Sequence, residues 1–519
     1  MLRDALAAAV YTLGTLDERA SGAAFTAWRV TVPADRAARA RDGLGAQVAV
    51  DPHGGVSMAV RRHRNGCGSV PMRSAQEMGR VGMSNAQVTT AGTEAHYDVV
   101  VVGGGSAGVA AAVGAAEAGA RTLVLEAAGF LGGAATLRCV QTYCGLYTIA
   151  DEVRPAVAGV AARVVAVLRG LGGVEGPVKF RGVFMLLDTE AVKYALDTVC
   201  ADAGVDVLLH APLVRTDRDG DLVRSVVYHD HNGDHTVTAD AFVDASGECD
   251  LAYFAGAATR YGNHGFVNLG TLGTRFGGIA ADADLSEETW HDAIHAAKQA
   301  GVGPLSKDTS MLARVPLSGD VITYLVSEAY DARSAASISA AERLGRKQAW
   351  AYLDVIRTIT GCHNAYLAVT GPEFGTRESR HIDCRYQLTE ADIAAGARFD
   401  DSVALGAWGM EWHDAVTTQS KFRLPGGNGV YEIPLDALTS ADTPNLFAAG
   451  RTADGDQYAG ASLRVMGTAF ATGQACGVAA AHYAHHPKAA VSEVQSALRT
   501  QGALIDGDDL PEPVDLVST

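Results

Sequence analysis

The pattern of apolar positions is most regular between Tyr97 and Glu126. A Val-rich run follows Asp98 and is typical of a parallel strand buried on both faces. A glycine-rich turn comes next, then an Ala-rich helical stretch to Gly119 and a second apolar run, Thr122–Leu125. We therefore predict a strand–helix–strand unit with a tight turn before the helix.

The turn of this unit fits G-x-G-x-x-G. Gly103 allows the tight turn, Gly105 lets the backbone approach a pyrophosphate, and Gly108 lets the helix pack closely on the strand. The N–H groups and the positive dipole end of the helix favour phosphate. Glu126, after the second strand, is suited to accept hydrogen bonds from a ribose 2′-OH. The sequence therefore predicts a dinucleotide site that favours an unphosphorylated adenosine ribose.

The apolar pattern predicts further elements of the same domain. Asp188 or Thr189 is suited to cap a helix that extends to Ala203. Asn232-Gly233 is typical of a hairpin turn. Strands are predicted at Val205–Leu209, Leu213–Arg215, Leu222–His229, Thr236–Val243 and Asn445–Gly450, and helices at Ser462–Ala481 and Val491–Thr500. This order predicts an α/β nucleotide-binding domain with an inserted β-meander.

Changes of composition divide the chain into four parts. Residues 1–82 are rich in Arg, lack Lys and show no sustained periodicity. We expect them to be a poorly ordered N-terminal extension or to precede a start at Met83, with a small subdomain as the alternative. Residues 83–255 and 426–519 carry the nucleotide-binding pattern. Residues 256–425 are more polar and aromatic and predict a separate, smaller substrate domain.

Composition narrows the functional classes. The chain has 519 residues, 48% of them hydrophobic and 19% charged, as in ordinary globular proteins. The net charge of −17 disfavours nucleic acid as a partner, and no apolar run is long enough to span a membrane. The eight Cys show no regular pairing, so we expect free thiols in the cytoplasm. No His or Cys spacing is typical of a metal site. A small-molecule substrate is the expected partner, and a homo-oligomer stays open.

Five segments together resemble the FAD-dependent oxidoreductase family. They are VVVVGGGSAGVAAAVGAAEAGARTLVLE, FLGGAAT, DASGECDLAYFAGA, GTRESRHI and NLFAAGRTADGDQYAGASLRVMGTAFATGQACGVAAA. The resemblance places the chain among glutathione-reductase-like flavoproteins, near the succinate dehydrogenase/fumarate reductase flavoprotein group. It implies an α/β fold with a Rossmann-type FAD-binding domain, an inserted β-meander and a smaller α+β substrate domain. It also implies an enzyme with FAD, which we expect to be bound non-covalently.

The resemblance implies a cofactor site residue by residue. The pyrophosphate would lie at Gly103, Gly105, Ser106, Ala107 and Gly108, with the adenosine ribose at Glu126. The loop that begins at Ala127 would pass close to the cofactor, with Gly133 and Thr136 beside the ribityl chain or the flavin. Adenine would meet the backbone of Val214. The remaining contacts would come from Ala245, Ser246, Gly247, Gly450, Arg451, Ser462, Val465 and Met466.

The expected reaction is removal of hydride from a small alcohol, amine or CH–CH unit, with reoxidation by oxygen or an external acceptor. Reduction of an activated double bond is the alternative. If residues 375–382 form a strand, Arg377, Ser379 and His381 share one face, and Glu378 and Arg380 form a bracing pair on the other. Arg377 is suited to hold a carboxylate, and His381 or His413 to take a proton. Tyr458 and Arg464 are further catalytic candidates.

Two Cys residues support rival interpretations. Cys139 and Cys144, with His486-Pro487, resemble the redox groups of a disulfide reductase, and Cys139 could instead bond to the flavin. However, the chain has no second G-x-G-x-x-G unit for a nicotinamide cofactor, which disfavours the first interpretation. A non-catalytic or tRNA-modifying flavin-binding protein is a further alternative, although the acidic chain does not favour it.

Overall fold

The computed structural model describes residues 27–31, 47–50, 55–59, 95–414 and 420–517. The chain divides into two compact units, Met1–Asn85 and Ala86–Thr519. In the described part of the first unit, β3 pairs antiparallel with both neighbouring strands; the three are β1 (Ala27–Thr31), β2 (Gln47–Val50) and β3 (Gly55–Ala59). Most of the expected poorly ordered extension lies outside the described residues. No described helix is long and apolar enough to cross a membrane.

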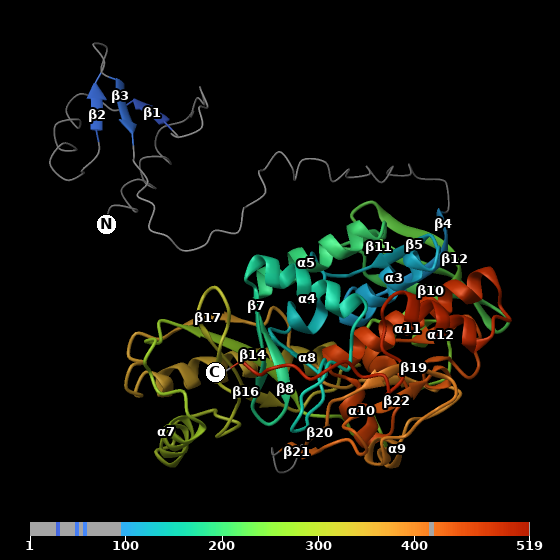
Figure 1. The fold of residues 1–519 in the computed structure, drawn as a ribbon. Helices are drawn as coiled ribbons and strands as arrows, with labels where there is room; N and C mark the ends of the chain where they lie inside the picture. The colour runs from blue at the N-terminus through green and yellow to red at the C-terminus, as the bar shows by residue number, and fades with distance from the viewer. Residues whose placement is uncertain (1–26, 32–46, 51–54, 60–94, 415–419, 518–519) are drawn as a thin grey trace. The chain divides into compact units, whose positions relative to one another are not determined.

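A seven-stranded sheet organises the second unit (Figure 1). Its strands are β4 (Ala95–Val102), β5 (Thr122–Leu125), β9 (Asp206–Leu208), β10 (Leu213–Asp219), β11 (Leu222–Asp230), β12 (Gly233–Asp244) and β23 (Leu446–Ala448). The order is β10-β11-β12-β4-β5-β9, and β23 pairs with β12. Strands β9, β5, β4, β12 and β23 are parallel, whereas β10, β11 and β12 form an antiparallel meander. The predicted Rossmann-type sheet with its inserted meander is confirmed.

Strand β4 is apolar on both sides because each side meets a different core. Val99 and Val101 face the core with α3 (Ser106–Glu117) and α11 (Met466–His485), while Val100 and Val102 face the core beneath the meander. The run of valines therefore reflects a strand covered on both faces, as expected for a parallel sheet.

Helices α3 and α11 lie side by side against the sheet (Figure 1). A Cβ atom on Gly473 would collide with the carbonyl oxygen of Ala107, and one on Gly477 with that of Ala111. Two glycines one turn apart on α11 therefore let the helix backbones approach closely. This contact fixes the N-terminus of α11 relative to the glycine turn.

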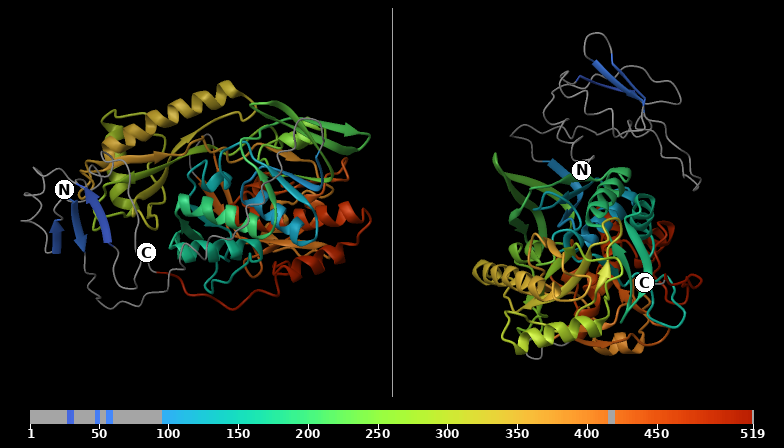
Figure 2. Two further views of the ribbon diagram at one scale, coloured as in Figure 1. Left: turned by 90° about the horizontal axis from the view of Figure 1, so that it is seen from above. Right: turned by 90° about the vertical axis from the view of Figure 1, so that its left-hand side faces the viewer.

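A second sheet lies within residues 256–425. It has the order β15-β16-β14-β17, formed by β14 (Gly270–Gly277), β15 (Ala313–Arg314), β16 (Val321–Glu328) and β17 (Tyr366–Thr370). Helix α8 (Ala335–Ile356), the long yellow helix in the left view of Figure 2, packs on β14, β16 and β17. Helix α7 (Glu287–Gln299) packs against α8. The division of residues 83–519 into domains stays a prediction, because Ala86–Thr519 forms one compact unit.

A small sheet, formed by residues that precede this region in the sequence, packs against the second sheet. It consists of β6 (Thr142–Cys144), β7 (Val174–Lys179) and β8 (Val183–Leu187), in the order β6-β8-β7. Val178, Phe184 and Leu186 pack against Val315 and Ile322. The remaining helices and strands are α4 (Val160–Leu171), α5 (Thr189–Asp202), α6 (Asp250–Phe254), β13 (Thr259–Tyr261), β18 (Arg380–Ile382), α9 (Glu390–Ala395), β19 (Ser402–Gly406), β20 (Met410–His413), β21 (Ser420–Arg423), β22 (Tyr431–Pro434), α10 (Gln457–Leu463) and α12 (Val491–Thr500).

Two predicted elements differ from the structure. The expected single helix Ser462–Ala481 is two helices, because α10 ends at Leu463 and α11 begins at Met466, with Val465 in an extended conformation between them. The break creates a new helix N-terminus. The expected strand over residues 375–382 is a strand only at Arg380–Ile382, preceded by an isolated bridge from Gly375.

Candidate active site

The glycine turn ahead of α3 leaves open space where its middle glycine lies. A Cβ atom on Gly103, whose φ is +97°, would meet the Ala245 carbonyl oxygen, and one on Gly108 would collide with the Gly103 carbonyl oxygen. Both glycines are therefore required by the fold. Gly105 is different, because its φ is −70° and a Cβ atom there would have its nearest neighbour, the Cα atom of Gly133, 3.8 Å away.

A second observation supports a ligand at this turn. The hydroxyl of Ser106, in the first turn of α3, is buried and has no hydrogen-bond partner in the described part of the chain. Gly105 caps the helix without a side chain, so no side-chain group blocks the N–H groups of the first turn. An unpaired hydroxyl beside free N–H groups suits a phosphate oxygen.

Glu126 is buried and held from two sides. Its Oε2 accepts a hydrogen bond from the Gly104 N–H at 2.7 Å, and its Oε1 accepts one from the Ala128 N–H at 2.8 Å. Each carboxylate oxygen can accept a further hydrogen bond, so both hydroxyls of a ribose can still be bound. Ala127, the next residue, is exposed.

Some of the other predicted cofactor residues lie around this turn. Ala245 donates its N–H to the Val102 carbonyl, and Ser246 donates to Asp244, which fixes the end of β12 below Gly103. Val214 lies at a register shift between β10 and β11, so its backbone is outside the β-ladder pairing. A Cβ atom on Gly450 would lie 2.9 Å from the Ala107 side chain.

Three predicted residues have structural contacts of their own. Thr136 donates its hydroxyl to the Leu131 carbonyl, which closes the loop that contains Gly133. Ser462 donates to the Trp408 carbonyl at 2.6 Å. A Cβ atom on Gly247 would lie against the Arg451 guanidinium. None of Thr136, Ser462 and Gly247 lines the cavity described next.

A cavity of about 520 Å³ extends from Ala134, Val465 and Met466 to His291 of α7. We call it the cationic pocket, after the charges of its lining residues. Its positive side chains are Arg138, Arg181, Lys298, Lys307, Arg377, Arg451 and Arg464, and its acidic ones are Glu287, Asp308 and Glu411. The pocket thus connects the N-terminus of α11 with the second sheet.

Most of these cations have an acidic partner. Arg181 pairs with Glu287 at 2.8 Å, and Lys298 pairs with Asp308. Within the described residues, Arg377 and Lys307 form no ion pair; Arg377 donates only to the Leu269 carbonyl, at 2.6 Å. Burial and the nearby Arg464 lower the pKa of Arg377 to about 10, which leaves it charged at neutral pH. The pocket therefore has an excess of positive charge.

Arg464 and His413 complete this end of the pocket. Arg464 lies after α10 and donates to the Glu411 carbonyl at 3.0 Å, with the Glu411 carboxylate 3.6 Å away. Arg464 Nε and His413 Nδ1 are buried without a hydrogen-bond partner in the described structure. Burial and the nearby Arg377, Arg464 and Lys307 hold the pKa of His413 well below its ordinary value, so this imidazole is neutral.

Arg451, Arg138 and Glu248 form a second charged cluster at the pocket wall. Glu248 Oε1 lies 2.9 Å from Arg451 and 3.6 Å from Arg138. Burial opposes its ionisation, but the two guanidinium groups lower its pKa overall. Arg451 also donates to the Thr376 carbonyl at 2.7 Å. Arg451 is thus engaged in an ion pair, and its predicted contact with the cofactor stays a prediction.

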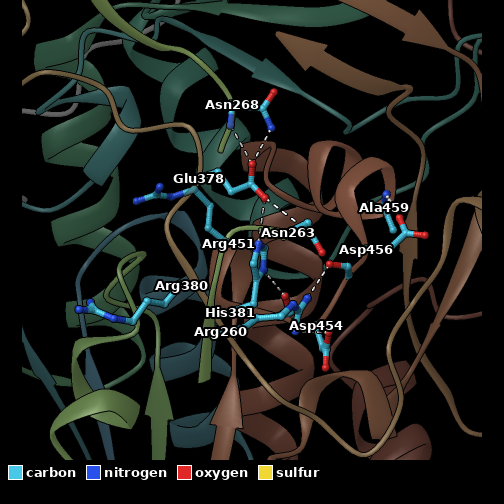
Figure 3. Close-up of polar contacts among 12 residues, drawn as sticks. Arg260, Asn263, Asn268, Glu378, Arg380, His381, Arg451, Asp454, Asp456 and Ala459 are labelled. Atoms are coloured by element: carbon cyan, nitrogen blue, oxygen red, sulfur yellow. Dashed lines mark hydrogen bonds and ion pairs between the residues drawn. The ribbon is translucent and has the colours of Figure 1, made fainter. Parts of the chain in front are cut away.

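His381 lies outside the pocket, in a buried network centred on Glu378 (Figure 3). Its Nδ1 faces the Ala453 carbonyl at 2.9 Å, and its Nε2 faces Glu378 at 3.2 Å. Glu378 also accepts hydrogen bonds from Asn263 and Asn268. His381 is fixed in this network by both ring nitrogens, because each of them faces an acceptor of the protein. This arrangement does not suit the role of proton acceptor predicted for it.

The predicted sharing of faces along residues 375–382 is therefore wrong. Arg377 lines the pocket, whereas His381 is buried against Ala453. Glu378 pairs with His381 and not with Arg380, whose guanidinium stacks on the Tyr253 ring at 3.9 Å. The cause is that residues 376–379 are not in a strand, so alternation does not apply to them.

The network around Glu378 reaches the pocket through one residue. Asn268 donates to Glu378 with its side chain and accepts a hydrogen bond from the His413 N–H at 2.8 Å. Tyr458, another predicted catalytic residue, does not line the pocket; its ring lies 6.4 Å from that of Trp412.

The two Cys residues of the rival interpretation are poor nucleophiles. Cys139 and Cys144 are free thiols. Burial raises the pKa of Cys139 to about 11 and that of Cys144 to about 12, so both stay protonated at neutral pH. Only Cys144 lines the pocket, and His486 does not.

Within the described residues, one group of side chains has metal-ligating atoms that lie close together, and two of its members line the pocket. His291, His295 and Asp308 bring these atoms within 4.8 Å of one another, although the sequence predicted no metal site. The ammonium of Lys298 already pairs with Asp308. A cation would therefore compete with Lys298 for the same carboxylate.

Most residues that line the pocket were not identified from the sequence, and Arg138, Lys307 and Glu411 are among them. Arg138 lies shortly after the glycine-rich loop, so its nearness to that loop was a usable signal. Lys307 follows Gly303-Pro304 in a segment without periodicity, and only the folded chain places it beside Arg377.

A family model described as FAD dependent oxidoreductase matches residues 98–504. The chain belongs to this family. The FAD-dependent oxidoreductase has no significant match among the curated proteins compared with it. The match ends at residue 504 and begins inside β4, so it includes both sheets and the pocket.

Solved structures with a similar fold cover most of this FAD-dependent oxidoreductase. One is a geranylgeranyl bacteriochlorophyll reductase-like protein from Thermoplasma acidophilum, with 15% identity, 79% of this chain and 83% of that chain covered, and a TM-score of 0.41. Another is CabE, an aromatic hydroxylase from angucycline biosynthesis, with 13% identity, 80% and 70% covered, and a TM-score of 0.39. A third is BexE, with 14% identity, 78% and 66% covered, and a TM-score of 0.42.

The residues of this FAD-dependent oxidoreductase fit the cofactor of its family. The open side of Gly105 and the unpaired Ser106 hydroxyl suit the pyrophosphate. Glu126 retains acceptor capacity for the ribose. Val465 caps α11 without a side-chain hydrogen bond, so the N–H groups of Met466 and its neighbours are free to stabilise negative charge at the pocket.

Proposed function

We propose that this FAD-dependent oxidoreductase oxidises a small organic substrate that carries a carboxylate or similar anionic group. The single observation that supports this proposal is Arg377, a half-buried, charged guanidinium in the pocket that forms no ion pair within the described residues. Burying a cation without a counter-ion is costly, and an anionic substrate removes that cost.

Arg377 and Arg464 have separate tasks in this proposal. Arg377 holds the substrate anion, because a guanidinium can donate two parallel hydrogen bonds to a carboxylate. The unpaired Nε of Arg464 offers a further donor, while Glu411 holds the rest of that side chain in place. Trp408 and Phe422 line the same pocket and give it an aromatic surface. The bound FAD supplies the acceptor for the hydride that leaves carbon.

The cofactor is proposed to be non-covalent. The buried, protonated Cys139 is not suited to attack a flavin, and it does not line the pocket. The direction of the reaction stays open to the alternative, reduction of an activated double bond, because the same cations bind an anion in both directions.

The Arg377→Met variant tests the proposal. We expect it to retain FAD and the melting temperature of the wild type, because its guanidinium donates to a single backbone carbonyl. Anaerobic reduction of the flavin by a carboxylate substrate should slow by about a hundredfold or more, the order expected for a lost charged contact. Arg346→Met, at an exposed position on α8, is the matched control and should behave as wild type. Normal reduction by Arg377→Met would contradict the proposal.

A further inference from the structure

Lys307 has a firmly held backbone. Its N–H donates to the Tyr352 hydroxyl at 2.8 Å, and that hydroxyl donates to the Lys307 carbonyl at 2.7 Å. The preceding residue, Ser306, donates its hydroxyl to the Leu325 carbonyl and its N–H to Gln348. Two residues of α8 and one strand of the second sheet thus fix this part of a loop that has no regular secondary structure.

The side chain of Lys307 has no partner of its own. It lines the cationic pocket, and within the described residues its ammonium nitrogen makes no hydrogen bond or ion pair. Lys298 in the same pocket is different, because it pairs with Asp308. An anchored backbone that presents an unpaired amine to a cavity is an arrangement expected of a residue that acts on a ligand.

The groups around Lys307 oppose its charge. Burial is the largest effect, and Arg377, Arg464 and Arg181 add repulsion that Glu411 offsets in part. Together they lower the pKa of Lys307 to about 7, so a large share of the molecules carries a neutral amine at neutral pH. The titratable and charged groups that line the pocket with it are Arg138, Cys144, Arg181, Glu287, His291, Lys298, Asp308, Tyr324, Arg377, Glu411, His413, Arg451 and Arg464.

The other groups of the pocket are less suited to take a proton. Arginine side chains stay protonated in proteins. Burial and nearby cations hold the pKa of His413 far below neutral, which makes it a weak base. Burial raises the pKa of Tyr324, which therefore keeps its proton. The Glu411 carboxylate is already engaged by Arg464 and His413, each 3.6 Å away.

We propose that Lys307 is the proton acceptor of the oxidation, a catalytic role that rests on the proposed function of the pocket. The neutral amine takes the proton from the hydroxyl or amine nitrogen of the substrate and becomes an ammonium. The electron pair of the O–H or N–H bond forms the new C=O or C=N bond. The C–H bond breaks, and its hydrogen leaves with both electrons of that bond to the oxidant of the family, so the substrate loses one hydride, which carries two electrons, and one proton. The ammonium then returns its proton to water.

The first test measures Lys307 without turnover. The purified full-length holoenzyme is labelled with acetic anhydride over a range of pH, and the labelled lysines are quantified by mass spectrometry. We expect the reactivity of Lys307 to rise with a midpoint near pH 7. The exposed Lys347 on α8 is quantified in the same samples as the internal comparison. An ordinary midpoint for Lys307 would overturn the proposal.

The second test separates proton transfer from anion binding. Lys307→Met should lower the rate of anaerobic flavin reduction by about a hundredfold to ten-thousandfold, and the rise of that rate through pH 7 should disappear. Added primary amines should restore part of the rate. If Lys307 only bound the anion, substrate affinity would fall while the pH profile stayed, and this result would overturn the proposal. Lys347→Met is the control.

The two proposals can fail separately. If neutral analogues reduce the wild-type flavin as fast as carboxylates do, the proposed function fails. The labelling experiment still reports the pH at which Lys307 loses its proton, because it needs no substrate. If carboxylates reduce the wild type and Lys307→Met keeps both its rate and its pH dependence, only the role of Lys307 fails.

Discussion

Glu378 and His381 show, at the scale of single residues, how burial determines what a side chain can do. A histidine in a predicted flavin-facing segment suggested a base, yet both of its nitrogens face acceptors. Sequence could not show this, because Ala453 and Asn268 come from distant parts of the chain. The same pairing explains how Glu378 can be buried, because an unpaired buried carboxylate would destabilise the fold.

Glu378→Gln should destabilise the protein by about 3 kcal/mol at neutral pH, the order expected when one member of a buried ion pair is removed. Burial alone would raise the pKa of Glu378, but hydrogen bonds from His381 and Asn268 lower it overall. A carboxylate with a lowered pKa stabilises the fold above its unfolded pKa and loses that contribution as the pH falls. Urea unfolding of both proteins should therefore give stabilities that converge in acid. A difference that is constant with pH would contradict this pairing.

At the scale of elements, a helix or strand was predicted correctly where the sequence pattern that indicates it lies within the element. The strand–helix–strand unit and α12 (Val491–Thr500) are confirmed because the apolar pattern that predicts them lies within the elements themselves. The predicted strand at 375–382 was wrong because Glu378 and Arg377 take their positions from tertiary contacts. The break at Val465 has no glycine or proline to signal it.

The glycine turn before α3 offers a prediction at this scale. Gly105→Ala should keep the stability of the apoprotein, because the added Cβ atom meets nothing closer than 3.8 Å. Its FAD affinity should fall, because the methyl group occupies the space predicted for the pyrophosphate. Gly108→Ala should destabilise the apoprotein, because its Cβ atom would collide with the Gly103 carbonyl. Thermal melting and FAD titration of both apoproteins measure these effects. Unchanged FAD affinity in Gly105→Ala would place the pyrophosphate elsewhere.

At the scale of the whole molecule, the nucleotide-binding unit was predictable and the cationic pocket was not. The glycine turn and Glu126 lie close together in sequence and share one supersecondary unit. The pocket takes Lys307, Arg377 and Arg464 from three separate segments, so their nearness exists only after folding. The proposal of an anionic substrate rests on the excess of positive charge in that pocket and not on a sequence motif.

The most direct measurement is anaerobic reduction of the bound FAD by matched pairs of small hydroxy or amino acids and their neutral amides. Each pair differs only in the charge that Arg377 would bind. We predict that at least one carboxylate bleaches the flavin and that its amide does so about a hundredfold more slowly or not at all. Equal bleaching by acid and amide, or bleaching by neutral compounds alone, would contradict it.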